Sequence, residues 1–134
     1  MATTTAKITL TSTDLSANET LSLETTTSIV APHTTGLSRD VVKSTAKGTA
    51  SGQVTLYTAD DYAAIGYLYI KNTSTTAADK IYIYDDTTSG DPIIIQLAGG
   101  DWGFVPMHGD KTLKAYAPNG SDPTIEWMII GTDQ

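Results

Sequence analysis

Ile65-Gly66-Tyr67-Leu68-Tyr69-Ile70 and, after a polar segment, Lys80-Ile81-Tyr82-Ile83-Tyr84 are the runs that decide the fold, because both alternate tyrosine with aliphatic residues. Successive side chains of a β-strand point to opposite faces, so this alternation predicts two strands. Antiparallel pairing across 71–79 sets Leu68 against Ile83, Ile70 against Ile81, Tyr69 against Tyr82 and Tyr67 against Tyr84. The expected hairpin has one aliphatic face and one tyrosine face.

The tyrosine face is the candidate functional surface, and its residues are Tyr67, Tyr69, Tyr82 and Tyr84. Aromatic side chains are enriched at protein interfaces, so we expect a partner subunit to cover them. Two other interpretations stay open: the rings stack on sugars, or they lie on a wet surface with solvated hydroxyls. The faces could also be exchanged, with the tyrosines in the core. A sandwich covers one face of each sheet, so either arrangement predicts a partner.

Length and charge limit the class of protein. The 134 residues are enough for one well-packed domain, and 8 basic against 15 acidic residues give a net charge of −7. This balance disfavours nucleic acid and anionic membranes as partners. Without cysteine the chain has no disulfide or thiolate metal site, which suits synthesis in a reducing cytoplasm. No basic segment followed by an apolar run opens the sequence, so we expect no secretory signal, and no apolar run could span a bilayer.

Short strands separated by turns account for most of the sequence. Threonine, a strand former, occurs 24 times, 14 of them in the first fifty residues, and no helical periodicity is evident. The sequence predicts an all-β fold, an antiparallel β-sandwich of the jelly-roll kind with an extended N-terminal arm. The expected strands are 7–11, 20–24, 40–45, 53–58, 65–71, 80–85, 92–97, 103–105, 111–117 and 124–130. In the last strand, Ile125, Trp127 and Ile129 are predicted to face the core.

The composition changes near residue 50, after which all tyrosines, both tryptophans and the phenylalanine occur. We therefore expect residues 1–35 to form a Thr-rich arm or edge hairpin, and residues 36–134 to form the sandwich domain. The arm could be ordered against a neighbouring molecule. Equally, its aliphatic residues (Leu21, Leu23, Ile29 and Val30) could dock on the parent sheet.

The chain offers little catalytic chemistry. His33 and His108 are both expected in loops, and the sequence lacks nucleophile-elbow and zinc-protease motifs. Aspartates at 60–61, 85–86, 91 and 101 could gather around a hard cation such as calcium, but loop aspartates usually cap turns. The asparagines lie in Asn-x-Ser/Thr triplets (Asn18, Asn72 and Asn119), which a Ser/Thr-rich chain produces by chance. We expect no enzyme activity, no cofactor and no metal.

Several segments taken together resemble small virion structural proteins of tailed bacteriophages. The resemblance is one of layout and covers about residues 36–133 (Tyr67–Thr73, Asp79–Tyr84, Leu97–Pro106, Leu113–Ala117 and Glu126–Thr132). Within that group the chain looks most like a capsid decoration, or cement, protein. Such proteins are small β-rich subunits that commonly trimerise over junctions between capsomers and extend a terminal arm across the shell. No single functional residue is carried over, because the pattern is architectural.

The resemblance implies a virion protein, assembled in the host cytoplasm, that stabilises a phage capsid by binding the major capsid protein across subunit junctions. It further implies a homo-oligomer, most simply a trimer, in which several weak contacts combine through effective concentration. Two other functions remain open from the residues: a carbohydrate-binding module that uses the tyrosine platform, and a tail or connector component of the particle.

Overall fold

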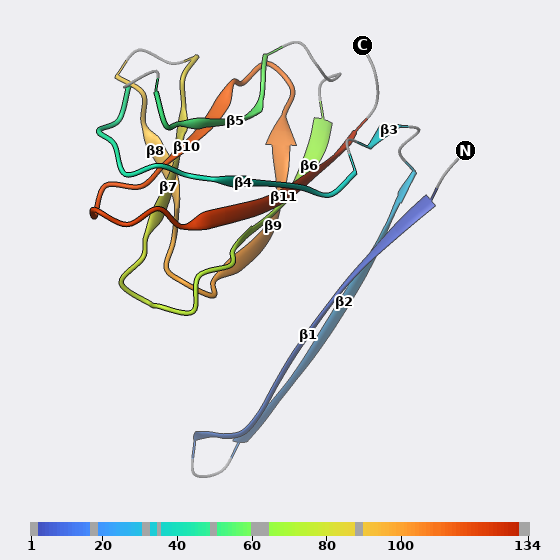
Figure 1. Ribbon diagram of the computed structural model, residues 1–134. Helices are drawn as coiled ribbons and strands as arrows, with labels where there is room; N and C mark the ends of the chain where they lie inside the picture. The colour runs from blue at the N-terminus through green and yellow to red at the C-terminus, as the bar shows by residue number, and fades with distance from the viewer. Residues whose placement is uncertain are drawn as a thin grey trace. The chain divides into compact units, whose positions relative to one another are not determined.

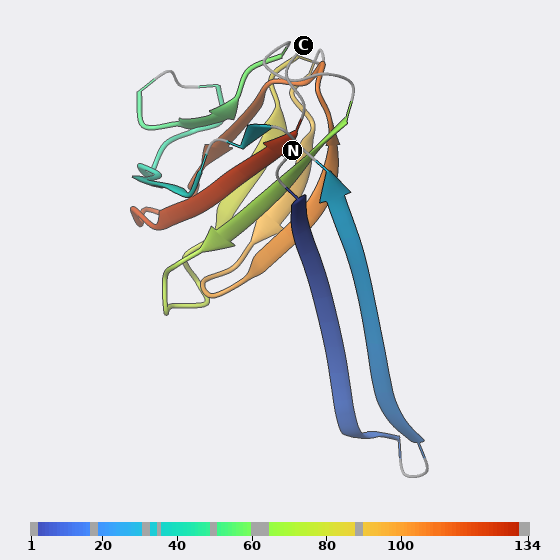
Figure 2. The same cartoon turned by 90° about the vertical axis from the view of Figure 1, so that its right-hand side faces the viewer.

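The computed structural model describes residues 3–16, 19–30, 33–34, 36–48, 51–59, 65–87 and 90–131. The chain divides into two compact units, Met1–Pro32 and His33–Gln134. The first unit contains β1 (Thr3–Ser16) and β2 (Glu19–Val30), which pair antiparallel as a long two-stranded ribbon (Figure 2). The N-terminal segment is therefore a hairpin, and its strands are longer than the sequence predicted.

The second unit is a β-sandwich, as predicted, and its described residues form two antiparallel sheets (Figure 1). One sheet has the order β5 (Val54–Tyr57), β10 (Leu113–Tyr116), β7 (Ile81–Asp85), β8 (Ile93–Leu97). The other has the order β3 (His33–Thr34), β11 (Thr124–Gly131), β6 (Ile65–Asn72), β9 (Trp102–His108), and β4 (Ser38–Val41) also pairs with β11. Every predicted strand overlaps an observed one, and the short β3 was not predicted.

The strands pair as a folded ribbon. Pairing joins β4 to β11, β5 to β10, β6 to β9 and β7 to β8. The first of these strands in the sequence thus pairs with the last, the second with the second to last, and so on, until the middle two strands, β7 and β8, pair as a hairpin. This is the jelly-roll arrangement, in which the doubled ribbon wraps around one core.

The predicted hairpin of 65–71 with 80–85 is wrong. β6 pairs with β9 and β11, whereas β7 pairs with β8 and β10, so the two runs belong to different sheets. The segment between them crosses from one sheet to the other. The observed arrangement is still consistent with the alternation of tyrosine and aliphatic residues, because the aliphatic side of each run faces the core.

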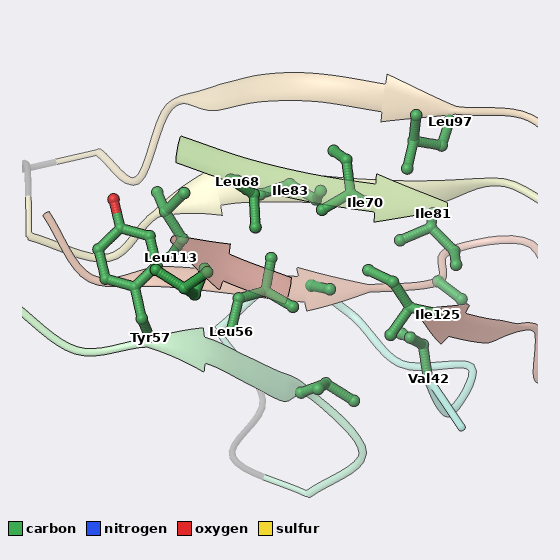
Figure 3. Packing of buried hydrophobic residues seen from close by; sticks show 14 residues of the cluster. Val42, Leu56, Tyr57, Leu68, Ile70, Ile81, Ile83, Leu97, Leu113 and Ile125 are labelled. Carbon is green, nitrogen blue, oxygen red and sulfur yellow. The ribbon is translucent and has the colours of Figure 1, made fainter. Parts of the chain in front are cut away.

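The core lies between the two sheets (Figure 3). Leu68 and Ile70 of β6 and Ile81 and Ile83 of β7 have no exposed area, which confirms their predicted place. Ile125 and Ile129 are buried with them and Trp127 packs against the cluster, also as predicted. The Trp127 indole Nε1–H donates to the Leu56 carbonyl at 3.2 Å, which links β11 to β5 of the other sheet.

Candidate interaction surface

The outer side of the sheet that contains β6 and β9 carries a group of aromatic side chains. In the β6–β9 pairing Tyr69 lies opposite Phe104, and Lys71 lies opposite Trp102. Since residues two apart share a face, Tyr67, Tyr69, Trp102 and Phe104 all point away from the core. We call these four residues the outer aromatic face. The rings of Tyr67 and Phe104 stack with centroids 5.6 Å apart, and Trp102 is 57% exposed.

A polar network adjoins the outer aromatic face. Glu126 of β11 accepts a hydrogen bond from Arg39 Nε of β4 at 2.6 Å and another from the Tyr69 hydroxyl at 3.0 Å. The bond from Arg39 is the largest effect that lowers the pKa of Glu126, against partial desolvation that raises it. Desolvation, and then the bond to Glu126, raise the pKa of Tyr69. The carboxylate thus ties three neighbouring strands together on this side of the sheet.

A second aromatic cluster lies on the outer side of the other sheet. Tyr82 is directly opposite Tyr116 in the β7–β10 pairing, and their rings stack at 5.5 Å. Tyr84 meets Tyr116 edge to face at 5.8 Å, and its hydroxyl donates to Gln53 Oε1 at 2.9 Å. Tyr84 has no exposed area and Tyr116 is 7% exposed, so only Tyr82 is partly accessible.

The four predicted interface tyrosines therefore do not share one face. Tyr67 and Tyr69 belong to the outer aromatic face, while Tyr82 and Tyr84 lie on the opposite side of the sandwich. The physical reason is that the chain crosses from one sheet to the other between β6 and β7. The tyrosine side of β6 and the tyrosine side of β7 therefore point in opposite directions, each away from the core. Tyr84 offers no surface to a partner, since its own chain covers it. An interface role for the other tyrosines stays a prediction.

Trp102 and Phe104 were not assigned to this surface from the sequence. The signal was present, because 102–108 places aromatic residues at alternate positions between Gly103, Val105 and Met107, which face inward. Pro106 interrupts that pattern, and the predicted strand, 103–105, left out Trp102 at one end and 106–108 at the other. Proline is tolerated here because β9 is the edge strand of its sheet.

Three of the aspartates that were considered as cation ligands hold turns or pair with a lysine. Asp85 accepts from the Thr87 amide at 2.8 Å, Asp86 pairs with Lys114, and Asp101 accepts from the Ala98 amide at 2.9 Å. Over the ranges that the structure describes, no three His, Cys, Asp or Glu residues are grouped to hold a metal ion. Asp60, Asp61 and Asn18 lie outside the described residues, as does the side chain of His33.

A small recess opens where β6 begins and β9 ends. It holds about 10 Å³, room for about one water molecule, and its wall is mostly apolar (Tyr57, Gly66, Tyr67, Leu68, Met107, His108, Gly109 and Ile129). The Tyr57 hydroxyl donates to the His108 carbonyl at 3.1 Å. Burial, and then the charges of Asp85 and Asp110, raise the pKa of Tyr57 to about 12, so this phenol stays protonated at neutral pH. His108 Nδ1 lies 2.8 Å from Asp110 on the exposed rim.

The described part of the chain contains no helix long and apolar enough to cross a membrane. No family model matches the sequence, and no curated protein matches it either.

Proposed function

We propose that this chain is a non-enzymatic structural subunit of a bacteriophage virion, a decoration protein that binds across the junctions between major capsid protein subunits. The outer aromatic face is the surface by which the sandwich binds the shell. One observation carries the proposal: this sheet presents Trp102, Phe104, Tyr67 and Tyr69 outward, with the Trp102 side chain more than half exposed.

The chemistry of the face supports this role. Tryptophan and tyrosine dominate the binding energy of protein interfaces, and a folded domain seldom leaves such a group uncovered without a use for it. The sandwich is also a jelly roll, a fold found in viral capsid proteins and in lectins. That support is an analogy at the level of fold, since one fold serves many functions.

Binding to the shell tests the proposal. Purified protein is added to capsids that lack it, and co-sedimentation is compared for the wild type, Trp102→Ala and Phe104→Ala. Ile93→Ala on β8 is the matched control, because Ile93 is 48% exposed but lies in the other sheet. We expect both aromatic variants to bind at least about tenfold more weakly, the loss of a 1.4 kcal/mol contact, and the control to bind normally.

Copy number in the purified particle provides a second check. We expect quantitative mass spectrometry to find hundreds of copies per particle, as a shell component requires. A handful of copies would assign the chain to a tail or connector instead. Unchanged binding of Trp102→Ala and Phe104→Ala would contradict the assigned surface.

A carbohydrate-binding module is the second candidate, and the polar network favours it specifically. Rings that can stack on a sugar lie beside the Glu126 carboxylate and the Arg39 guanidinium, which can bond to sugar hydroxyls. Glycan-array binding that Trp102→Ala abolishes, together with absence from the shell, would favour this function over the first.

A further inference from the structure

The N-terminal hairpin has two chemically different faces. The β1–β2 register places Leu10 opposite Leu23, Ile8 opposite Thr25 and Ser12 opposite Leu21. Over the pairs from Thr4–Ile29 to Ser12–Leu21, one face therefore carries no charged residue and most of the hairpin's aliphatic side chains (Ala6, Ile8, Leu10, Leu21, Leu23 and Ile29, with Thr4, Ser12, Thr25 and Thr27). Ile29, at one end of this face, is already buried, with 6% of its area exposed. We call it the aliphatic ribbon face.

The opposite face of the hairpin is polar. Over residues 5–11 and 22–28 it consists of threonine, serine and one ion pair, in which Lys7 Nζ lies 2.9 Å from Glu24 Oε2. Hydrophobic and polar residues thus alternate over 5–11 of β1 and over 21–24 of β2, as they do in a sheet with one buried side. A two-stranded ribbon by itself cannot bury such a side and is at best marginally stable in water. Leu10 and Leu23 are 49% and 48% exposed.

We propose that the aliphatic ribbon face packs against the same face of the hairpin of a second copy of this chain. The inference shares one assumption with the proposed function, namely that the subunit is present in many copies. It assigns self-association to the aliphatic ribbon face and not to the outer aromatic face.

The absence of charge makes this face suitable for contact with a second copy. Molecules that each carry a net charge of −7 repel one another, so they associate through surfaces that bring no like charges together. The aliphatic ribbon face meets this condition, and its own copy matches it in shape, in length and in the absence of charge. A symmetric pair also needs no second kind of surface, because a two-fold contact uses the same patch twice.

Area predicts how tight this contact is. Eight successive cross-strand pairs, Thr5 with Ser28 through Ser12 with Leu21, lie beyond the buried Ile29 and make a ribbon about 27 Å long and about 10 Å wide. Two such faces enclose roughly 500 Å², which is below the standard size of a stable interface. We therefore expect a reversible, concentration-dependent complex that becomes firm only where a shell holds many copies together.

Cross-linking tests the contact directly, because the chain has no cysteine of its own. Ile8 lies near the middle of the ribbon, so it meets its counterpart whether the two hairpins run parallel or antiparallel. Ile8→Cys and Thr9→Cys are compared in the full-length protein with a short bismaleimide linker. Thr9 is the matched control, because it is adjacent in sequence, is more exposed and points to the polar face.

We expect Ile8→Cys to form covalent dimers at least about tenfold faster than Thr9→Cys. Equal rates for the two variants, or no dimer from Ile8→Cys at concentrations of several hundred micromolar, would overturn the proposal. The second result would mean that the face is covered within one molecule or by a different protein.

Sedimentation provides the complementary measurement. We expect the double variant Leu10→Asn/Leu23→Asn to sediment as a monomer where the wild type associates, and Thr11→Asn/Ser22→Asn, a cross-strand pair on the polar face, to behave as the wild type does. A double variant at Leu10 and Leu23 with the wild-type mass would also overturn the proposal. Neither experiment contains capsids, so a negative result would contradict self-association but not shell binding by the outer aromatic face. Likewise, a failure to bind capsids would not contradict self-association through the hairpin.

Discussion

Asn72 lies fully buried at the end of β6, where the chain leaves one sheet for the other. Its amide Nδ2 donates to the carbonyls of Asp79 at 2.6 Å and Leu97 at 3.3 Å, and its Oδ1 accepts from the Ser74 amide at 3.1 Å. Asn72→Ala should lower the free energy of unfolding by about 1–3 kcal/mol, because it leaves buried carbonyls without donors. Urea denaturation measures the change.

The control for that prediction is Asn119→Ala. Asn119 is exposed and makes one bond, from Nδ2 to the Ala78 carbonyl at 3.2 Å, so we expect a change within about 0.5 kcal/mol. Equal losses for the two variants would contradict a special role of the buried amide in the crossing between sheets.

Gly99 is a second single position with a strong requirement. A Cβ added there would lie 2.1 Å from the Thr76 carbonyl oxygen, whereas one at Gly66 would come no closer than 3.6 Å to the Ile130 carbonyl oxygen. Gly99→Ala must push two backbone segments apart, so we expect a loss of about 1–3 kcal/mol in thermal or urea unfolding. Gly66→Ala should cost clearly less, and the reverse order of the two variants would contradict the close approach of these loops.

At the scale of elements, Glu126 joins β4, β11 and β6 through Arg39 and Tyr69. Its folded pKa is lowered from 4.5, so the stabilisation is present above about pH 4.5 and is lost as the pH falls through the folded pKa. We expect the stability advantage of the wild type over Glu126→Gln to shrink between pH 6 and pH 3. Denaturation curves across that range measure it.

Arg39→Met is the partner variant for this prediction. It removes the largest cause of the lowered pKa, so we expect it to lose most of the pH-dependent part of the stability that Glu126→Gln loses. The hydrogen bond from Tyr69 and the charge of Lys71 keep the remainder. Wild-type and Glu126→Gln stabilities that differ by a constant amount at every pH would show that the carboxylate does not tie these strands together.

At the scale of the whole molecule, the members of the core cluster among the described residues all lie from residue 42 onward. A chain of residues 33–134 should therefore fold without the hairpin, unfold cooperatively and keep the tryptophan emission of the full protein, because both tryptophans are retained. We expect it to sediment as a monomer if the aliphatic ribbon face carries self-association. Near-UV circular dichroism and sedimentation check both points, and a truncated chain without cooperative unfolding would contradict the independence of the sandwich.

The composition change near residue 50 predicted a separate N-terminal part, and the structure places the division between Pro32 and His33. That part is a hairpin with two distinct faces, which depends on the register of β1 against β2. Threonine content indicated strands there. It did not indicate which residues face each other, because that depends on pairing between segments distant in sequence.

The sequence by itself determined that the two runs, 65–70 and 80–84, are strands and which of their residues share a side. Leu68, Ile70, Ile81 and Ile83 follow the period of two that any β-strand imposes, and this is a local property of the backbone. Only the tertiary structure decided which strands are neighbours. A hairpin of β6 with β7 and two sheets that face each other both bury those same side chains, so the pattern is equally consistent with either. The jelly-roll pairing selects the second arrangement, because β9 and β11 flank β6 and leave β7 to face it across the core.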